Sequence, residues 1–266
     1  MYNNNSMNGT KYPIILAHGI VLKDVAFFKA FGRIQKSLGR AGYCVQTAKT
    51  DGFGLIETNA AQLKAFIEGV CEREHAEKVN IIAHSKGGLD AKYMIERLGM
   101  ADRVASLTTL CTPHRGSPVA SWLLRLPKLI RRFVAFWINL WYRIFGDKKP
   151  NALGVCRQLR ETPASETAAL AFSDKVYCQS YSTTLEKGRD DFVMGIPLML
   201  SRHMEKLPSD GLVSVESARF GEYRGSCVDE SVSHSEIVDF MAGKKKREKI
   251  HAFYLQLCGE LAEKGF

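Results

Sequence analysis

The feature that most restricts the fold is an apolar run that passes directly into a serine and two glycines, NIIAHSKGGLD at residues 80–90. The run up to Ala83 predicts a strand buried on both faces, and the residues from Leu89 onward predict a helix. Ser85 therefore lies on a sharp turn between strand and helix. Such a turn requires small residues two places before and two places after the serine, and Ala83 and Gly87 meet this requirement.

Strand and helix signals alternate along the whole chain. Strands separated by helices of ten or more residues predict an α/β fold with a mostly parallel sheet covered by helices on both sides. There is no internal repeat and no Pro- or Ser-rich linker, so we expect residues 1–266 to form one domain. The expected strands are 12–17, 43–48, 79–83, 104–111 and 175–183, and the expected helices are 27–38, 58–71, 89–98 and 250–262.

Ser85 alone is weak evidence for catalysis, because the same letters also fit a serine that merely caps a helix. A serine hydroxyl becomes a strong nucleophile beside an imidazole that is itself oriented by a carboxylate. With a turn of this kind the acid and then the histidine follow the serine along the chain. Asp210 in SDGLVSVESARFG and His234 in SHSEIVD fit that order, while Glu216 and Asp229 are rival acids in less specific positions.

Backbone N–H donors for a developing oxyanion are also expected near this turn. His18-Gly19 follows the first strand, where a loop of this kind supplies one donor. We expect the backbone N–H of Ile20 and that of Lys86, directly after the serine, to form the oxyanion hole. The Lys86 side chain receives no catalytic role.

Six segments in order, YPIILAHG, NIIAHSKGGLD, LTTLCTPHRGSPVA, VYCQSYS, SDGLVSVESARFG and SHSEIVD, together resemble the bacterial triacylglycerol lipases of the α/β-hydrolase superfamily, of the Pseudomonas and Burkholderia type. The resemblance implies an α/β-hydrolase fold that hydrolyses acylglycerols or related lipid esters. It implies Ser85 as nucleophile, His234 as general base and then acid, and Asp210 as the group that orients the imidazole. Alanine replaces the commonest glycine at the first position of the turn, as it also does in small Bacillus-type lipases.

Two other functions remain open at this point. The same triad serves thioesterases and acyltransferases, because it determines that an acyl group is transferred but does not specify the leaving group. A non-catalytic protein that binds a membrane surface is the third alternative.

No cofactor is expected to be required. The resemblance implies a structural calcium ion between a carboxylate upstream of the acid, Asp190 or Asp191, and Glu236, two places after His234. Calcium takes six to eight oxygen ligands, so two carboxylates support such a site only weakly.

A segment rich in aromatic and basic residues follows Pro118, and we expect residues 118–173 to form an inserted helical lid. It contains Trp122, Phe133, Trp137 and Trp141, which we assign to the lid and the substrate pocket. The uncharged run 133–142 is too short to span a bilayer, which takes about 20 residues, so it could lie on a lipid surface. The alternative is a helix packed on the core with a solvated basic edge.

The net charge of +9 is concentrated in two segments. Residues 118–150 hold seven cations against one Asp, and 244–249 hold five against one Glu, which leaves the remainder close to neutral. These segments match no nucleic-acid-binding module, so the expected partners are a lipid ester substrate and an anionic membrane or lipid droplet. Without a recognisable signal peptide we expect a cytoplasmic or peripheral membrane location, and a secreted form stays open.

Overall fold

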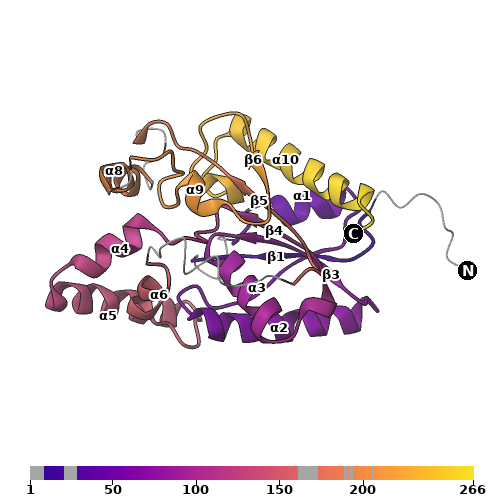
Figure 1. The fold of residues 1–266 in the computed structure, drawn as a ribbon, viewed down its shortest axis with the longest axis horizontal. Coiled ribbons are helices and arrows are strands. Elements are labelled where there is room, and N and C mark those ends of the chain that lie inside the picture. Colours follow the sequence, from indigo (N-terminus) through magenta and orange to yellow (C-terminus); the bar gives the residue numbers. More distant parts are fainter. Residues whose placement is uncertain (1–8, 21–28, 161–172, 189–190, 192–193, 205) are drawn as a thin grey trace, which may run out of the picture.

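Six parallel strands form one sheet in the order β2-β1-β3-β4-β5-β6 (Figure 1). The structure is a computed structural model that describes residues 9–20, 29–160, 173–188, 191, 194–204 and 206–266. The parallel pairing of all six strands confirms the expected parallel sheet. The strands are β1 (Ile14–Ala17), β2 (Val45–Thr47), β3 (Val79–His84), β4 (Val104–Leu110), β5 (Tyr177–Ser182) and β6 (Glu222–Ser226).

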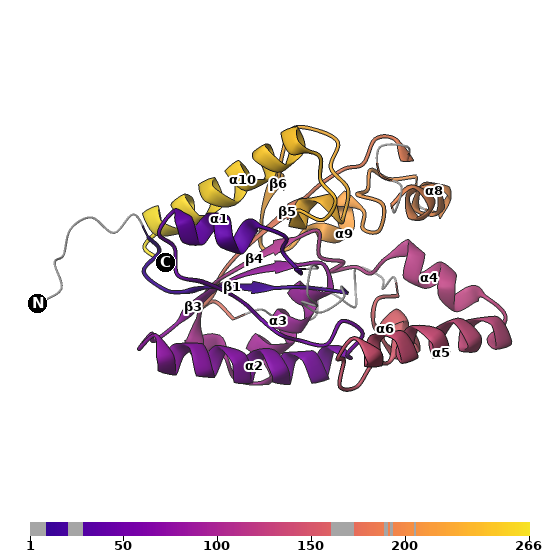
Figure 2. The same cartoon turned by 180° about the vertical axis from the view of Figure 1, so that it is seen from behind.

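Helices cover both faces of this sheet (Figures 1 and 2). Alternate residues of β1 point to opposite faces, as the pleat requires. Ile14 and Leu16 join the buried cluster formed with α1 (Ile34–Arg40) and α10 (Lys244–Glu263). Ile15 and Ala17 join the cluster formed with α2 (Ile56–Arg73) and α3 (Lys86–Arg97). The continuous apolar strands of the sequence are explained by this burial on both faces.

A group of helices lies beyond the carboxyl ends of the strands, at the opposite end of the molecule from the described chain termini (Figure 1). Pro127 separates the first two helices, since it precedes the first residue of the second one. The described part of the expected insertion is largely helical, and 161–172 lie outside the described residues. The helices are α4 (Pro118–Arg125), α5 (Lys128–Ile144), α6 (Ala152–Gln158) and α8 (Gly195–Met204), and the short α9 (Val215–Ala218) follows.

Several boundaries differ from expectation. Helix α1 begins at Ile34 after a turn, later than the expected start at residue 27, and residues 27 and 28 of the expected helix 27–38 lie outside the described ones. Helix α3 begins directly at Lys86, because the turn at Ser85 passes without a linker into the helix. Strand β6 and helix α8 were not predicted. The edge strand β6 alternates exposed and partly buried residues and therefore lacks an apolar run.

Helix α10 begins six residues earlier than expected, so that the basic run KKKREK forms its first turns. Cations at a helix N-terminus are unfavourable because the helix dipole is positive there. Two carboxylates from the preceding turn offset this effect. Lys246 Nζ lies 2.9 Å from both oxygens of Glu236, and Arg247 Nε lies 2.7 Å from Asp239 Oδ1.

Candidate active site

Ser85 occupies the turn between β3 and α3 with φ 55° and ψ −135°, a strained conformation for a residue that carries a side chain. A Cβ atom on Gly87 would stand 2.5 Å from the carbonyl oxygen of Ala17. A Cβ atom on Gly88 would stand 2.2 Å from Thr112 Oγ1, which itself donates to the Ser85 carbonyl oxygen over 2.8 Å. The two glycines thus let β1 and the loop after β4 close around the serine.

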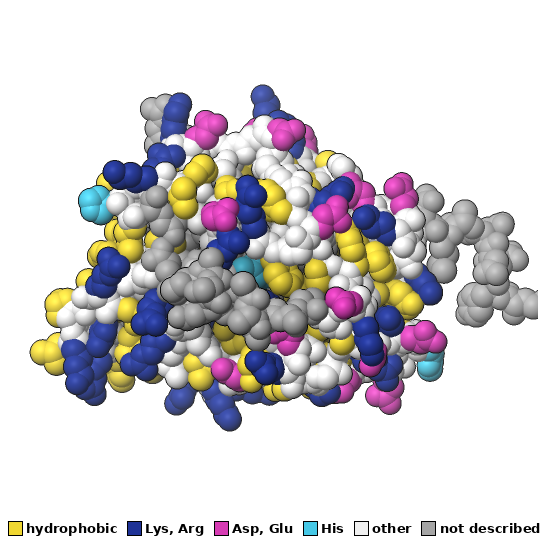
Figure 3. Space-filling view, in the orientation of Figure 1, with side chains coloured by type: hydrophobic (Ala, Val, Ile, Leu, Met, Phe, Trp, Pro, Cys, Tyr) yellow, Lys and Arg dark blue, Asp and Glu magenta, His cyan; other side chains and the backbone are white. Residues whose placement is uncertain are grey.

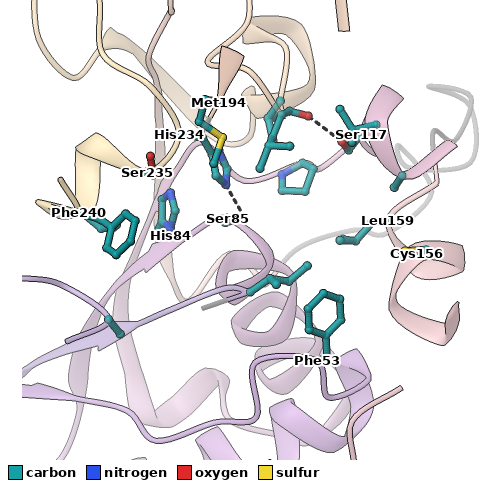
Figure 4. A pocket seen from close by; sticks show the side chains of 18 of the residues that line it. Phe53, His84, Ser85, Ser117, Cys156, Leu159, Met194, His234, Ser235 and Phe240 are labelled. Atoms are coloured by element: carbon teal, nitrogen blue, oxygen red, sulfur yellow. Dashed lines mark hydrogen bonds between the residues drawn. The ribbon is translucent and has the colours of Figure 1, made fainter. Parts of the chain in front are cut away.

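Ser85, His234 and Asp210 form one chain of hydrogen bonds (Figure 4 shows the bond between the first two). His234 Nε2 lies 2.8 Å from Ser85 Oγ, and His234 Nδ1 lies 2.7 Å from Asp210 Oδ2. An ionised carboxylate only accepts, so Nδ1 carries the proton and Nε2 is free to accept one from the serine. This is the arrangement that a nucleophilic serine needs.

The carboxylate of Asp210 is held by its own turn. Its Oδ1 accepts from the backbone N–H of Leu212 and of Val213 at 2.9 and 2.8 Å, and the residue is buried. The turn lies between the bridged residues Ser209 and Ser214, after α8. These bonds aim Oδ2 at the imidazole.

The two rival acids lie elsewhere. Glu216 is exposed and pairs with Arg115 and Arg219, and Asp229 is exposed near β6. His84 packs beside the triad, with its ring centroid 4.6 Å from that of His234. Burial holds the pKa of His84 well below its usual value, so this imidazole stays neutral.

The residues expected to donate to an oxyanion belong to two segments that meet at Ser85, the start of α3 and the loop after β1. Lys86 is the first residue of α3, so its N–H has no partner within the helix. Ile20 lines the pocket that contains the serine. A Cβ atom on Gly19 would stand 2.8 Å from the Lys86 nitrogen and 3.0 Å from Ser85 Oγ, so the loop after β1 passes directly against the nucleophile.

The Lys86 side chain has a partner that the sequence analysis missed. Its Nζ lies 2.7 and 2.9 Å from the two oxygens of Asp90, one helical turn further on, and both side chains are buried. Asn59 also donates to Asp90, at 3.1 Å. Burial raises the pKa of Asp90 to about 6 against the opposing effect of the ammonium group. The i, i+4 spacing in KGGLD was the available signal.

A largely apolar pocket of about 440 Å³ opens onto Ser85 and His234 (Figure 4). The inserted helices supply one wall, so the expected contact between the insertion and the pocket exists. The contacting residues of that wall are Val119, Ala120 and Leu123 of α4, Tyr142 of α5, Cys156 of α6 and Leu159.

The four aromatic residues expected in the pocket do not line it. Trp122, Phe133, Trp137 and Trp141 are 38%, 65%, 54% and 55% exposed. Helical spacing shows which residues share a face, but not whether that face points inward. Ala135 is the only buried residue of α5, and the apolar face of this helix points to solvent (Figure 3).

Two aspartates connect the C-terminal end of α5 to the loop after β2, each accepting hydrogen bonds from the backbone of the other segment. Asp147 accepts from the backbone N–H of Gly52 and Phe53, at 2.9 and 2.8 Å. Asp51 accepts from the backbone N–H of Lys148 and Lys149, both at 3.1 Å. These four bonds hold that end of α5 against the body of the molecule.

The residues considered for calcium are already engaged. Both oxygens of Glu236 accept from Lys246 Nζ, and Oε2 also accepts from the Ser233 backbone N–H at 3.0 Å. Asp191 accepts from the hydroxyls of Ser233 and Ser235. Asp190 lies outside the described residues. An ammonium group beside Glu236 repels a divalent cation, so the described residues do not fit a calcium site there.

Cys111, Asp210 and His234 bring ligand-type atoms within 4.8 Å of one another. A metal would require the thiolate of Cys111, but a hydrogen bond with Cys227 and burial raise the pKa of this thiol well above its usual value. Asp210 and His234 are hydrogen-bonded to each other. The group therefore fits a triad with a thiol behind it better than it fits a metal site.

Comparisons with known proteins show what this chain is similar to. The model of the family described as palmitoyl protein thioesterase matches residues 13–143. Triacylglycerol lipase 2 of Saccharomyces cerevisiae is 28% identical over 264 residues, which cover 88% of this chain and 73% of that protein. The triacylglycerol lipase of Burkholderia plantarii is 30% identical over 169 residues, which cover 60% of this chain and 47% of that protein.

Solved structures show the same fold. A metagenomic carboxyl esterase aligns with a TM-score of 0.72 at 15% identity, covering 96% of this chain and 76% of that one. The Staphylococcus hyicus lipase aligns with a TM-score of 0.68 at 14% identity, covering 98% of both chains. The architecture is the α/β-hydrolase fold. The expected resemblance to triacylglycerol lipases is confirmed, and the relatives support the expected class, a carboxylic ester hydrolase.

Proposed function

We propose that this protein hydrolyses acylglycerols or related lipid esters through an acyl-enzyme on Ser85. The single observation that carries the proposal is the hydrogen-bond chain from Asp210 through His234 to Ser85, on a strained turn that faces an apolar pocket. Relatives named triacylglycerol lipase support the ester as the bond that is cleaved.

In the first step Ser85 Oγ attacks the ester carbonyl carbon while His234 Nε2 takes the hydroxyl proton. Asp210 keeps the imidazole in the required tautomer and stabilises its cationic form. The carbonyl oxygen becomes an oxyanion, which the N–H groups of Ile20 and Lys86 stabilise by about 3–4 kcal/mol each.

In the second step the C–O bond to the leaving group breaks, and His234 Nε2 returns its proton to the departing alkoxide. A water molecule then attacks the acyl carbon, with His234 as base and the same two N–H donors. The fatty acid leaves and Ser85 regains its proton. The apolar pocket wall formed by α4 and α6 supports an acyl chain as the group bound there.

A thioesterase is the second candidate. It is favoured by the match of residues 13–143 to the palmitoyl protein thioesterase family. The same acyl-enzyme would form, with a thiolate in place of the alkoxide as leaving group.

We further propose that the helices α4, α5 and α6 cap the pocket and rest on an anionic membrane or lipid droplet. No helix in the described ranges is long and apolar enough to cross a bilayer. The solvent-facing side of α5 nevertheless carries nine exposed apolar residues, and at 100° per residue Arg132 and Arg143 border this stripe. An apolar stripe with a basic edge complements anionic lipid. The stripe consists of Leu129, Ile130, Phe133, Val134, Phe136, Trp137, Leu140, Trp141 and Ile144.

Activity is tested with p-nitrophenyl esters from butyrate to palmitate, with Ser85→Ala beside the parent. The proposal predicts hydrolysis by the parent and a loss of roughly 10⁴-fold or more in the variant. A parent inactive on every ester, or a variant that keeps the parent rate, would overturn it. Acyl thioesters of the same chain lengths, compared by kcat/KM, distinguish the second candidate.

Lipid binding is tested by flotation with vesicles that contain anionic lipid. Trp137→Ser/Trp141→Ser should lose binding while it still hydrolyses soluble p-nitrophenyl butyrate, because neither residue lines the pocket. Thr58→Ala/Lys64→Ala on α2 serves as the control. Unchanged binding of the tryptophan variant would contradict the docking surface.

A further inference from the structure

A second hollow, of about 680 Å³, lies beside the acyl pocket between α1 and the start of α10. Lys29 and Phe240 line both the hollow and the pocket, so the two spaces adjoin. We call this hollow the basic groove, defined by Lys29, Arg33, Lys36, Arg40, Asp239 and His251.

Four cations from α1 and the turn before it line the basic groove. Lys36 and Arg40 lie one turn apart on α1, Lys29 and Arg33 lie in the segment just before this helix, and all four line the groove. All four are exposed, and within the described part of the chain no ion pair is found for any of them. Like charges held together without counter-charges favour an anionic ligand.

The carboxylate of Asp239 does not neutralise this face. Its Oδ1 lies 2.7 Å from Arg247 Nε, and its Oδ2 accepts from the Arg33 backbone N–H at 3.0 Å. The side chain is 1% exposed. A Cβ atom on Gly32 would stand 2.7 Å from Asp239 Cβ, so the two walls of the groove are closely packed. Asp239 therefore supports the floor of the groove, while the four cations stay available.

The position of the groove relative to Ser85 indicates which part of a substrate would reach it. In Figure 4, Phe240 lies on one side of Ser85, while Phe53, Cys156 and Leu159 lie on the other side. An acyl chain among Phe53, Cys156 and Leu159 directs the leaving group towards Phe240 and the groove.

We propose that the basic groove binds phosphate on the leaving group of the substrate. The inference rests on the proposed function and narrows it to acyl esters or thioesters with a phosphorylated leaving group. Arg and Lys side chains form charge-assisted hydrogen bonds with phosphate oxygens. Two sources carry this chemistry, the headgroup of a lysophospholipid and coenzyme A.

Two matched substrate pairs test the inference. The first pair is 1-octanoylglycerol 3-phosphate and 1-octanoylglycerol, and the second is octanoyl coenzyme A and the octanoyl thioester of N-acetylcysteamine. Lys36→Glu/Arg40→Glu should lower kcat/KM for a phosphate-bearing substrate by about tenfold or more, and by less than about twofold for its neutral partner. Neither residue lines the acyl pocket.

The matched control is Lys49→Glu/Arg97→Glu, which makes the same charge change at exposed positions that line neither space. This control should affect all four substrates by less than about twofold. A selective loss with the glycerol phosphate substrate identifies a lipid headgroup, and a selective loss with the coenzyme A substrate identifies that cofactor. Equal effects on charged and neutral substrates, or no effect, would overturn the inference.

A binding measurement separates the inference from the proposed activity. Calorimetry with Ser85→Ala measures the affinity for glycerol 3-phosphate and for coenzyme A without turnover. The groove variant made in this background should bind at least one of them about tenfold more weakly. The groove is refuted if Ser85→Ala binds neither compound, or if the groove variant binds as tightly as Ser85→Ala. Either result would count even if the protein hydrolyses neutral esters. An inactive parent that still binds through the groove would refute the activity alone.

Discussion

Lys86 Nζ donates to both carboxylate oxygens of Asp90, at 2.7 and 2.9 Å, in a buried ion pair directly after the nucleophile. Residue 86 thus has two separate parts to play. Its backbone N–H is the proposed oxyanion donor, and its side chain pairs with Asp90 one turn further along the same helix, α3. Removing the partner leaves a buried ammonium without a counter-charge.

Asp90→Leu should lower the free energy of unfolding by about 3–5 kcal/mol, because an unpaired charge would stay buried. Lys86→Met/Asp90→Leu should recover most of that loss, since an apolar pair of similar size carries no desolvation cost. Urea unfolding measures both variants. Lys175→Ala, which breaks the exposed pair with Asp102, is the control and should cost less than about 1 kcal/mol. If the double variant is no better than the single one, the ion pair is not the cause.

Asp210→Asn should lower kcat by about 10⁴-fold with little change in KM, because the amide stabilises the wrong tautomer of His234. Steady-state kinetics on a soluble ester provides the measurement. Glu216→Gln, at the exposed rival acid, should keep the parent rate. If Asp210→Asn kept the parent rate and Glu216→Gln lost activity, Glu216 would be the orienting carboxylate.

Acid should destabilise the protein through His114. Burial lowers the pKa of His114 to about 3 from its ordinary 6.5. Between these values the unfolded chain binds a proton that the folded protein does not. The contribution of His114 to stability is therefore complete above pH 6.5 and is lost as the pH falls towards 3, at up to about 1.4 kcal/mol per pH unit.

His114→Asn should reduce this pH slope by about one proton in unfolding experiments between about pH 7 and about pH 4. His75→Asn is the matched control, because His75 is exposed and has φ 52°, a conformation that asparagine tolerates. A slope that His114→Asn leaves unchanged would assign the acid sensitivity to other groups.

Chelation of calcium should leave the melting temperature and the esterase rate unchanged, because Lys246 Nζ already bonds both oxygens of Glu236. Lys246→Ala should lower the free energy of unfolding by about 1.5–3 kcal/mol. The control is Lys249→Ala, whose side chain is 59% exposed and pairs with Glu230. A melting temperature that falls with EDTA and returns with added calcium would contradict this account.

The hydrogen-bonded arrangement of Ser85, His234 and Asp210 could be predicted from the sequence because local geometry restricts it strongly. A serine at φ 55° needs Gly87 against the backbone of β1, and that requirement is visible in the letters. Chain order then selected Asp210 and His234. What the order did not show was the turn that holds Asp210, where Leu212 and Val213 donate from within the same loop.

The remaining differences from the structure concern where side chains point and which side chains they pair with. The apolar spacing of α5 predicted a helix face correctly, but Trp137 and Trp141 point to solvent because the opposite face, with Ala135 and Tyr142, packs inward. Only the backbone of Lys86 was given a role, because sequence spacing does not show that its side chain is buried against Asp90. Strand β6 escaped prediction since an edge strand has no apolar run to mark it.

The most direct test of the central claim is covalent labelling with an alkyl fluorophosphonate, followed by mass spectrometry of the peptides. We expect one adduct, on the peptide that contains Ser85, and its disappearance in Ser85→Ala. Hydrolytic activity in a protein whose Ser85 stays unlabelled, or an adduct on a different serine, would contradict the assignment of Ser85 as the nucleophile.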